Sequence, residues 1–315
     1  MQSIQTGKSM QAIVITRPGP PEVLQLQEVT NPAPKANEVQ IRVHAATVTA
    51  GDALLRKLPS WLWLPMQILT PHRRKQIPGH ELAGEVESIG KDVTRFAPGD
   101  QVFGTTTGLS VGANAEYVSL PEAWPAGVLA RKPVNLSYAE AAALPVGGMT
   151  ALQLLRRASL QRGQKVLIYG ASGSVGTMAV QLARHFGAEV TGVCSTANLA
   201  LVRSLGAQTV VDYTQEDFTL GGETYDVIFD AVGKGPASRS KKSLKPGGRY
   251  LSVTASTREQ TDDLVFLSEL AEAGLIRPVI DRRYPLAQTA DAHRYVETGR
   301  KRGNVVLTSE PSPLH

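Results

Sequence analysis

A glycine turn between an expected strand and an expected helix constrains this chain more than any other feature. The apolar run KVLIY (165–169) is typical of a buried strand, and Gly170, Gly173 and Gly176 follow it. Residues 174–186 then repeat apolar side chains at helical spacing. Such a turn lets the backbone approach a pyrophosphate, which binds free N–H groups at the start of the helix. The spacing G-x-x-G-x-x-G alone is weak evidence, but its place between strand and helix predicts a dinucleotide site; a tight turn without ligand is the alternative.

The rest of the chain shows two different patterns of apolar and polar residues. Between residues 10 and 135, short alternating runs such as 38–46 and 82–90 are separated by Gly and Pro, which is typical of a β-rich domain. From 136 to 277 strands and helices alternate, with a helix expected over 150–158 and a strand over 225–231, and the strands are almost continuously apolar. This pattern predicts an α/β fold with a doubly wound parallel sheet, here of five strands where six are usual. Residues 278–315 return to the first pattern, the short alternating runs of a β-rich domain.

Composition excludes several classes of protein. The chain has 315 residues, with 33 Lys+Arg against 28 Asp+Glu, and a formal net charge of +5. Its basic residues lie in small dispersed groups without aromatic residues between them, so we expect no nucleic-acid partner. The single cysteine, Cys194, excludes an intramolecular disulfide framework and a zinc site built on several thiolates. The N-terminal residues lack an apolar signal segment and the most apolar stretch, 58–69, is short and contains two prolines, so we expect no membrane insertion and a cytoplasmic setting.

The residues that follow the second strand of the alternating half, 189–194, favour NADPH over NADH. NAD-binding chains carry an acidic residue about twenty positions beyond the glycines. Here Ser195 and Thr196 stand instead, and their hydroxyls could donate to a 2′-phosphate. Tyr213 ends the neighbouring strand. The alternative is that Ser195 or Thr196 only caps the next helix.

Long motifs are spread along nearly the whole chain. They are PGPPEVLQL (18–26), EVQIRVHAATVTAGD (38–52), PGHELAGEVESIGKDVTRFAPGDQVFG (78–104), AEYV (115–118), AAALPVGGMTAL (141–152), the glycine turn, SLGAQTVVDY (204–213), YDVIFDAVG (225–233), LKPGGRYL (244–251) and HRYVETGRKRGNVVL (293–307). In this order they resemble the medium-chain dehydrogenase/reductases, specifically their zinc-free quinone oxidoreductase-like branch. The resemblance implies a GroES-like catalytic domain, residues 10–135 completed by 278–315, and a Rossmann cofactor-binding domain, residues 136–277. It places the active site in the cleft between them.

The resemblance also implies where a nicotinamide cofactor binds. Thr150 and Val232 would border the nicotinamide half, and Gly303 and Asn304 would approach the cofactor from the other domain. Together with the residues of the turn and of the strand ends, the expected cofactor-binding residues are Thr150, Gly170, Ser172, Gly173, Ser174, Val175, Gly176, Ser195, Thr196, Tyr213, Val232 and Asn304.

The catalytic zinc of related enzymes is not expected here. Zinc-dependent members use a Cys, the His of a GHE motif and a second Cys, and the matching positions hold Thr49, His80 and Val146. Two thiolates are missing and valine cannot ligate a metal. His80 and Glu81 remain, and the alternative role of His80 is a hydrogen-bonded residue of the cleft wall.

Without a Lewis acid, quinones and α,β-unsaturated carbonyls are easier acceptors than plain ketones, because the negative charge that hydride brings is delocalised. We expect an NADPH-dependent oxidoreductase with a small hydrophobic acceptor of this kind. The candidate catalytic residues are Thr49, Asp52 and His80, with His80 as a proton donor; protonation of the product by water is the alternative. Asp52 could instead cap a helix beginning at Ala53. The alternatives are an alcohol or aldehyde dehydrogenase, and a non-catalytic NADPH-binding sensor or structural protein.

The sequence does not determine the oligomeric state of the protein. The family normally has a further helix and a sixth strand after the LKPGGRYL strand, whereas residues 249–256 here lead almost directly into an expected helix at 262–274. In this family the sixth strand commonly pairs with its twin in a dimer, so we expect that dimer to be weakened or replaced. The segment 60–75, with Trp61 and Trp63, is an apolar lid, a satellite cluster or an oligomer contact.

Overall fold

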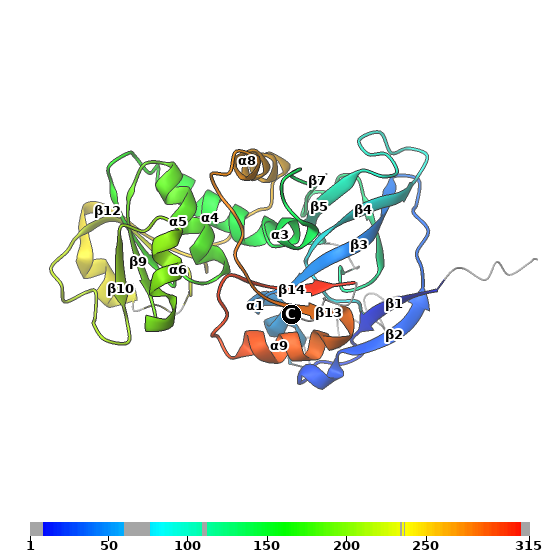
Figure 1. Cartoon of the computed structure of the whole chain (residues 1–315), viewed down its shortest axis with the longest axis horizontal. Coiled ribbons are helices and arrows are strands. Elements are labelled where there is room, and N and C mark those ends of the chain that lie inside the picture. Colours follow the sequence, from blue (N-terminus) through cyan, green and yellow to red (C-terminus); the bar gives the residue numbers. More distant parts are fainter. Residues whose placement is uncertain (1–8, 60–75, 109–111, 234, 236, 310–315) are drawn as a thin grey trace, which may run out of the picture. The chain divides into compact units, whose positions relative to one another are not determined.

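The computed structural model describes residues 9–59, 76–108, 112–233, 235 and 237–309. The chain forms two compact units (Figure 1). The β unit takes its described residues from 1–145, 282–300 and 305–315, and the α/β unit takes them from 146–281 and 301–304. The alternatives for Trp61 and Trp63 lie outside the described residues.

The β unit is built on a sheet with the strand order β13-β14-β3-β4-β5-β7, in which β6 also pairs with β3. The bounds are Glu38–Val48 (β3), Glu81–Ile89 (β4), Gln101–Thr105 (β5), Tyr117–Pro121 (β6), Leu129–Arg131 (β7), Ile280–Pro285 (β13) and Asn304–Thr308 (β14). A separate antiparallel hairpin joins β1 (Ser9–Val14) to β2 (Gln25–Thr30). β3 is almost wholly buried, and antiparallel partners pair with both of its edges, β4 on one and β6 and β14 on the other.

The α/β unit contains a parallel sheet of five strands in the order β10-β9-β8-β11-β12, which confirms the predicted strand number. The bounds are Lys165–Tyr169 (β8), Glu189–Cys194 (β9), Thr209–Asp212 (β10), Tyr225–Asp230 (β11) and Leu244–Ser252 (β12). β8 is central, and its residues 166–168 have no exposed surface, as expected of a parallel strand covered on both faces. Two helices, α5 (Ser174–His185) and α6 (Leu199–Ser204), pack on β8, β9 and β10 (Figure 1).

Two helices begin earlier than the sequence indicates. The remaining helices are α1 (Ala50–Arg56), α3 (Tyr138–Ala142), α4 (Pro145–Arg157), α7 (Ala237–Ser240), α8 (Thr261–Glu272) and α9 (Thr289–Glu297), with short 3₁₀ turns at Pro21–Val23 (η1), Thr196–Asn198 (η3), Lys241–Ser243 (η4) and Leu286–Gln288 (η5). α1 begins before Ala53 because Thr49, and not Asp52, is its N-cap. α4 begins ahead of Thr150, since proline suits the first turn of a helix. Among the described helices, none is long and apolar enough to cross a membrane.

Candidate functional site

The three predicted catalytic residues Thr49, Asp52 and His80 lie together in the β unit. β3 ends at Val48, and Thr49 is the N-cap of α1. The Asp52 N–H donates to Thr49 Oγ1 over 3.1 Å, and the Thr49 N–H donates to Asp52 Oδ2 over 2.8 Å. This reciprocal capping box satisfies two N–H groups at the start of the helix and fixes the direction of the Asp52 side chain.

Asp52 also orients the imidazole of His80. Gly79, with a φ of +105°, turns the chain into His80, whose Nδ1 lies 2.6 Å from Asp52 Oδ1. The side chain of Asp52 is 2% exposed and that of His80 is 33% exposed. Burial alone would raise the pKa of Asp52, but the hydrogen bond and charge of His80 and the bonds from Thr49 hold that pKa below its ordinary value. Asp52 is therefore a carboxylate and Nδ1 donates to it, so Nε2 is the ring atom that can exchange a proton.

The neighbouring residues do not fit a catalytic zinc ion. Glu81 is buried and accepts a hydrogen bond from Thr47 Oγ1 over 2.5 Å. Of the positions that match the family's zinc ligands, Thr49 has its hydroxyl in the capping box, Val146 offers no ligand atom, and only His80 is a common ligand. Within the described ranges, no three His, Cys, Asp or Glu side chains form a group that could hold a metal.

The glycine turn lies at the carboxyl end of β8, and its three glycines meet different demands. Gly170 has a φ of +79°, and a Cβ on Gly176 would overlap the carbonyl oxygen of Gly170. Gly173 differs, because its φ is −81° and the nearest described atom outside its own neighbours and helix would be 3.6 Å from an added Cβ. The fold therefore does not require a glycine at position 173, and the side on which its Cβ would project is open apart from the Gly170 carbonyl oxygen.

The first turn of α5 and residues 303–304 of the C-terminal segment lie next to the glycine turn. The first N–H groups of a helix have no intrahelical acceptor, and the helix dipole favours a phosphate there. Ser174 Oγ donates to Asn304 Oδ1 over 2.6 Å, and the Gly303 N–H donates to the Ser172 carbonyl oxygen over 2.8 Å. Residues 301–304 are grouped with the α/β unit, and Asn304, the first residue of β14, contacts the glycine turn through Ser174.

At the end of β9 an amide that sequence reasoning missed orients two serines. Asn198 Nδ2 donates to Ser195 Oγ and to Ser172 Oγ, each over 3.2 Å. Both hydroxyl oxygens accept a hydrogen bond, so both hydroxyl protons can be donated to a phosphate. Ser195 precedes η3, and its side chain makes no capping hydrogen bond among the described residues, which disfavours the capping alternative.

Thr196 faces a carboxylate that sequence reasoning also missed. Its hydroxyl donates to Asp212 Oδ2 over 2.5 Å, and Thr214 Oγ1 donates to Asp212 Oδ1 over 2.7 Å. These hydrogen bonds lower the pKa of Asp212, because they stabilise its carboxylate form. Asp212 ends β10 in register with Cys194, so a carboxylate stands beside the end of β9 although β9 itself ends without one. The signal in the sequence is the acidic residue of TVVDY, once the parallel pairing of the two strands is known.

The other predicted cofactor residues come from different elements of the α/β unit. Val232 is 50% exposed and lies beside Gly170, where an added Cβ would come within 2.5 Å of its Cγ2. Tyr213 follows β10 and is 54% exposed. Val175 lies in the first turn of α5 and Thr150 in the middle of α4, and both are partly buried. The structure thus brings Val232 and Val175 to the glycine turn, whereas Thr150 is an interior helix residue.

Comparison with known proteins agrees with this arrangement. The family model of the alcohol dehydrogenase GroES-like domain matches residues 35–130, and that of zinc-binding dehydrogenases matches residues 174–277. The chain is 34% identical to a 2-methylene-furan-3-one reductase of Solanum lycopersicum, over 98% of this chain and 81% of that protein. It is 32% identical to an NADPH-dependent alkenal/one oxidoreductase of Arabidopsis thaliana, described as chloroplastic, over 96% of this chain and 81% of that protein. The solved structure of the quinone oxidoreductase from Coxiella burnetii superimposes with a TM-score of 0.86 at 29% identity, covering 96% of this chain and 100% of that one.

A GroES-like domain joined to a parallel Rossmann-type sheet defines a nicotinamide-dependent oxidoreductase of the medium-chain type. The chain belongs to the medium-chain dehydrogenase/reductase superfamily, in its quinone oxidoreductase-like branch, and is an NAD(P)H-dependent oxidoreductase.

Proposed function

We propose that this protein is an NADPH-dependent, zinc-free reductase of quinones or α,β-unsaturated carbonyls. The observation that carries the proposal is the Asp52–His80 pair, a carboxylate-oriented imidazole at the position where a zinc site would need two further ligands. The names of two relatives support the acceptor class, since one is a reductase of a methylene-furanone and the other an oxidoreductase of alkenals and alkenones.

The chain's own residues supply a proton and hold the cofactor. When bound, NADPH supplies the hydride that adds to the conjugated acceptor. The acceptor oxygen then carries negative charge, and His80 delivers a proton from Nε2 to neutralise it. Asp52 accepts from Nδ1 and stabilises the imidazolium before the transfer. One hydride and one proton together convert a quinone to a hydroquinone, and an enone to an enol that becomes the saturated ketone when its α carbon takes up a proton from water and its oxygen loses one.

The α/β unit supplies the residues that would bind NADPH. The N–H groups at the start of α5 and the open side of Gly173 suit the pyrophosphate, and the hydroxyls of Ser172 and Ser195 suit the 2′-phosphate. One observation favours NADH as a second candidate, because the Asp212 carboxylate stands beside Thr196 and would repel a 2′-phosphate.

A matched pair of variants separates the two cofactors. We expect NADPH to be preferred in wild type, Ser195→Ala to lower the ratio of NADPH to NADH turnover, and Asp212→Asn to raise it, because the two substitutions remove a donor and a repelling charge. A wild-type preference for NADH would overturn the NADPH assignment.

The acceptor is tested by following cofactor oxidation with benzoquinone, an alkyl vinyl ketone, a 2-alkenal and a saturated aldehyde, each with and without a metal chelator. We expect turnover with the first three acceptors and no effect of the chelator. Turnover of the saturated aldehyde that the chelator abolishes would instead indicate a metal-dependent alcohol dehydrogenase. Tight NADPH binding without turnover of any acceptor would indicate a sensor or structural protein.

A further inference from the structure

The helix that carries Asp52 has little apolar surface to hold it. α1 contains seven residues, of which Leu54 and Leu55 are 69% and 45% exposed. Its buried residues are Asp52, Ala53 and Arg56, so two of three are charged. Short helices are stabilised mainly by packing of an apolar face. Polar contacts at its two ends must therefore fix the position of α1.

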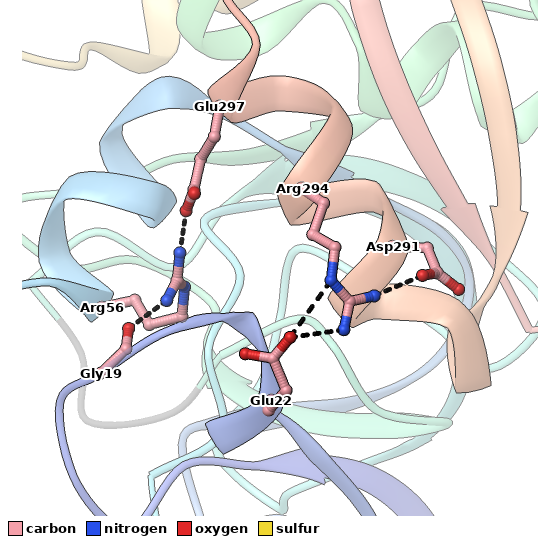
Figure 2. Close-up of polar contacts among 6 residues, drawn as sticks. All are labelled: Gly19, Glu22, Arg56, Asp291, Arg294 and Glu297. Carbon is pink, nitrogen blue, oxygen red and sulfur yellow. Dashed lines mark hydrogen bonds and ion pairs between the residues drawn. The ribbon is translucent and has the colours of Figure 1, made fainter.

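At its C-terminal end, α1 is fixed by a buried guanidinium. Figure 2 shows Arg56 between Gly19 and Glu297, with one terminal nitrogen donating to the Gly19 carbonyl oxygen and the other to the Glu297 carboxylate. The Gly19 N–H donates in return to the Arg56 carbonyl oxygen over 3.1 Å. Glu297 is the last residue of α9, and Lys57 Nζ lies 3.0 Å from its second carboxylate oxygen. Arg56 thus joins α1 to α9 and to the turn that precedes η1.

The buried guanidinium of Arg56 is better suited to fixing the position of α1 than to stabilising the fold. The side chain of Arg56 is 2% exposed, and burial lowers its pKa. Its Nε has no hydrogen-bond partner among the described residues, so part of its hydration is not replaced. A buried ion pair gives little net stability because desolvation offsets the attraction, but it fixes the relative position of the elements that it joins.

We propose that Arg56 is a positioning residue for the Asp52–His80 pair. Asp52 and Arg56 are one helical turn apart, about 6 Å along the axis, so a movement of α1 at Arg56 moves the carboxylate that orients His80. This inference rests on the proposed function, in which His80 is the proton donor. Arg56 itself touches neither His80 nor Asp52 through any hydrogen bond of the described structure, and acts through the helix.

A second arginine beside the first provides a matched control. Arg294 of α9 lies 2.6 Å from Glu22 and 2.5 Å from Asp291, and all three side chains are about half exposed (Figure 2). Exposed ion pairs of this kind contribute little to the free energy of folding. Arg294 also joins α9 to η1, and its hydrogen bonds to described residues go to Glu22 and Asp291 and not to α1.

The test compares Arg56→Gln with Arg294→Gln in the full chain, using enone reduction and the proton NMR spectrum. We expect Arg56→Gln to lower kcat by about tenfold to a hundredfold with an unchanged KM for NADPH, since a small misplacement of a reacting group has an effect of this size. The short Asp52–His80 hydrogen bond should give a far-downfield ring proton in wild type, which Arg56→Gln weakens and Arg294→Gln retains. Arg56→Lys should recover only part of kcat, because one ammonium nitrogen replaces the two separated guanidinium nitrogens that donate to Gly19 and Glu297.

Two outcomes overturn the proposal: an unchanged kcat and downfield proton in Arg56→Gln, or equal losses in Arg294→Gln. If Arg56→Gln does not fold, Glu297→Gln decides, because it keeps the side-chain length and removes only the charge that Arg56 binds. An unchanged downfield proton in that variant likewise contradicts the proposal. If wild type reduces no acceptor, the proposed function fails, and the NMR comparison still tests the positioning.

Discussion

At the residue scale, the proposed chemistry depends on the carboxylate that holds the His80 ring. Asp52 is buried and yet ionised, because the His80 ring and the Thr49 hydroxyl and N–H all donate to it. The same side chain closes the capping box of α1, so one carboxylate serves both the helix and the imidazole. Asp52 is thus the N3 residue of a helix that Thr49 caps, not the N-cap itself, and this helical role is compatible with the catalytic candidate.

Replacing this carboxylate tests its effect on His80. In Asp52→Asn we expect kcat to fall about a hundredfold, the order expected for loss of an oriented proton donor. The alkaline limb of the kcat profile should move to lower pH, because a neutral amide no longer favours the protonated imidazole. Asp92→Asn, at an exposed carboxylate of the β unit, is the control and should leave both quantities unchanged. A normal kcat in Asp52→Asn would contradict the role given to His80.

A second histidine governs stability in acid. His293 of α9 is fully buried, and neither ring nitrogen has a hydrogen-bond partner among the described residues. Burial lowers its pKa to about 4, although the charge of Asp52 acts in the opposite direction. The unfolded chain, with an ordinary value of about 6.5, takes up the proton first as pH falls. The free energy of unfolding should therefore drop by about 2 kcal/mol from this group between pH 7 and pH 5.

Urea titrations of wild type and His293→Leu at pH 7 and pH 5 measure this contribution. The variant should lose about 2 kcal/mol less than wild type over that interval, because leucine takes up no proton. Equal losses in the two proteins would show that His293 is not the group that destabilises the fold in acid.

At the element scale, one glycine of the turn can be replaced to test cofactor binding and another to test the stability of the fold. Gly173→Ala adds a methyl group where the nearest described atom outside its own neighbours and helix is 3.6 Å away, so the fold should tolerate it. The same methyl group would stand where the pyrophosphate approaches, so we expect the NADPH dissociation constant to rise about tenfold or more. Gly176→Ala should destabilise the fold by about 1–3 kcal/mol, because its Cβ overlaps backbone.

The melting temperature (Tm) and the NADPH dissociation constant are measured for both glycine variants. Unchanged Tm with weakened binding is expected for Gly173→Ala, and a lowered Tm for Gly176→Ala. If Gly173→Ala bound NADPH as tightly as wild type, the pyrophosphate would not lie beside this glycine.

Elements with strong local patterns could be predicted from the sequence, and contacts between distant elements could not. The strands β8 and β11 are continuous apolar runs, and the glycine turn is local, so both are found at their predicted places. β2 alternates weakly and is mostly exposed, which left no signal for it. The bond from Thr196 to Asp212 depends on the register of two parallel strands, and that from Arg56 to Glu297 joins residues 241 positions apart. No local pattern contains such information.

At the scale of the whole molecule, the five-stranded sheet leaves β12 at its edge. The first half of this strand contains Pro246 and Gly247, and Gly247 has a φ of +78°. Lys245 lies 2.7 Å from Asp226, and Arg249 donates to a carbonyl oxygen outside the strand. Proline, glycine and charged residues are the devices by which proteins keep sheet edges from pairing.

Assembly through this edge is therefore not expected. Hydrogen exchange measured at a low and a high protein concentration should show the same protection of the β12 amides, because no partner strand covers them. Light scattering on the same samples gives the oligomeric state. Protection of β12 that increases with the mass of the particle would contradict this expectation and indicate the edge-to-edge dimer that is common in the family.

The proposed activity is the reduction of a conjugated acceptor by hydride addition without a metal. The most direct measurement is a single turnover of an α,β-unsaturated ketone with NADPH deuterated at the transferred position, in chelator-treated buffer, with the product analysed by NMR. We expect a saturated ketone with deuterium on the carbon β to the carbonyl and a solvent-derived proton on the α carbon. An allylic alcohol with deuterium on the carbonyl carbon, or no product until a divalent metal is added, would contradict it.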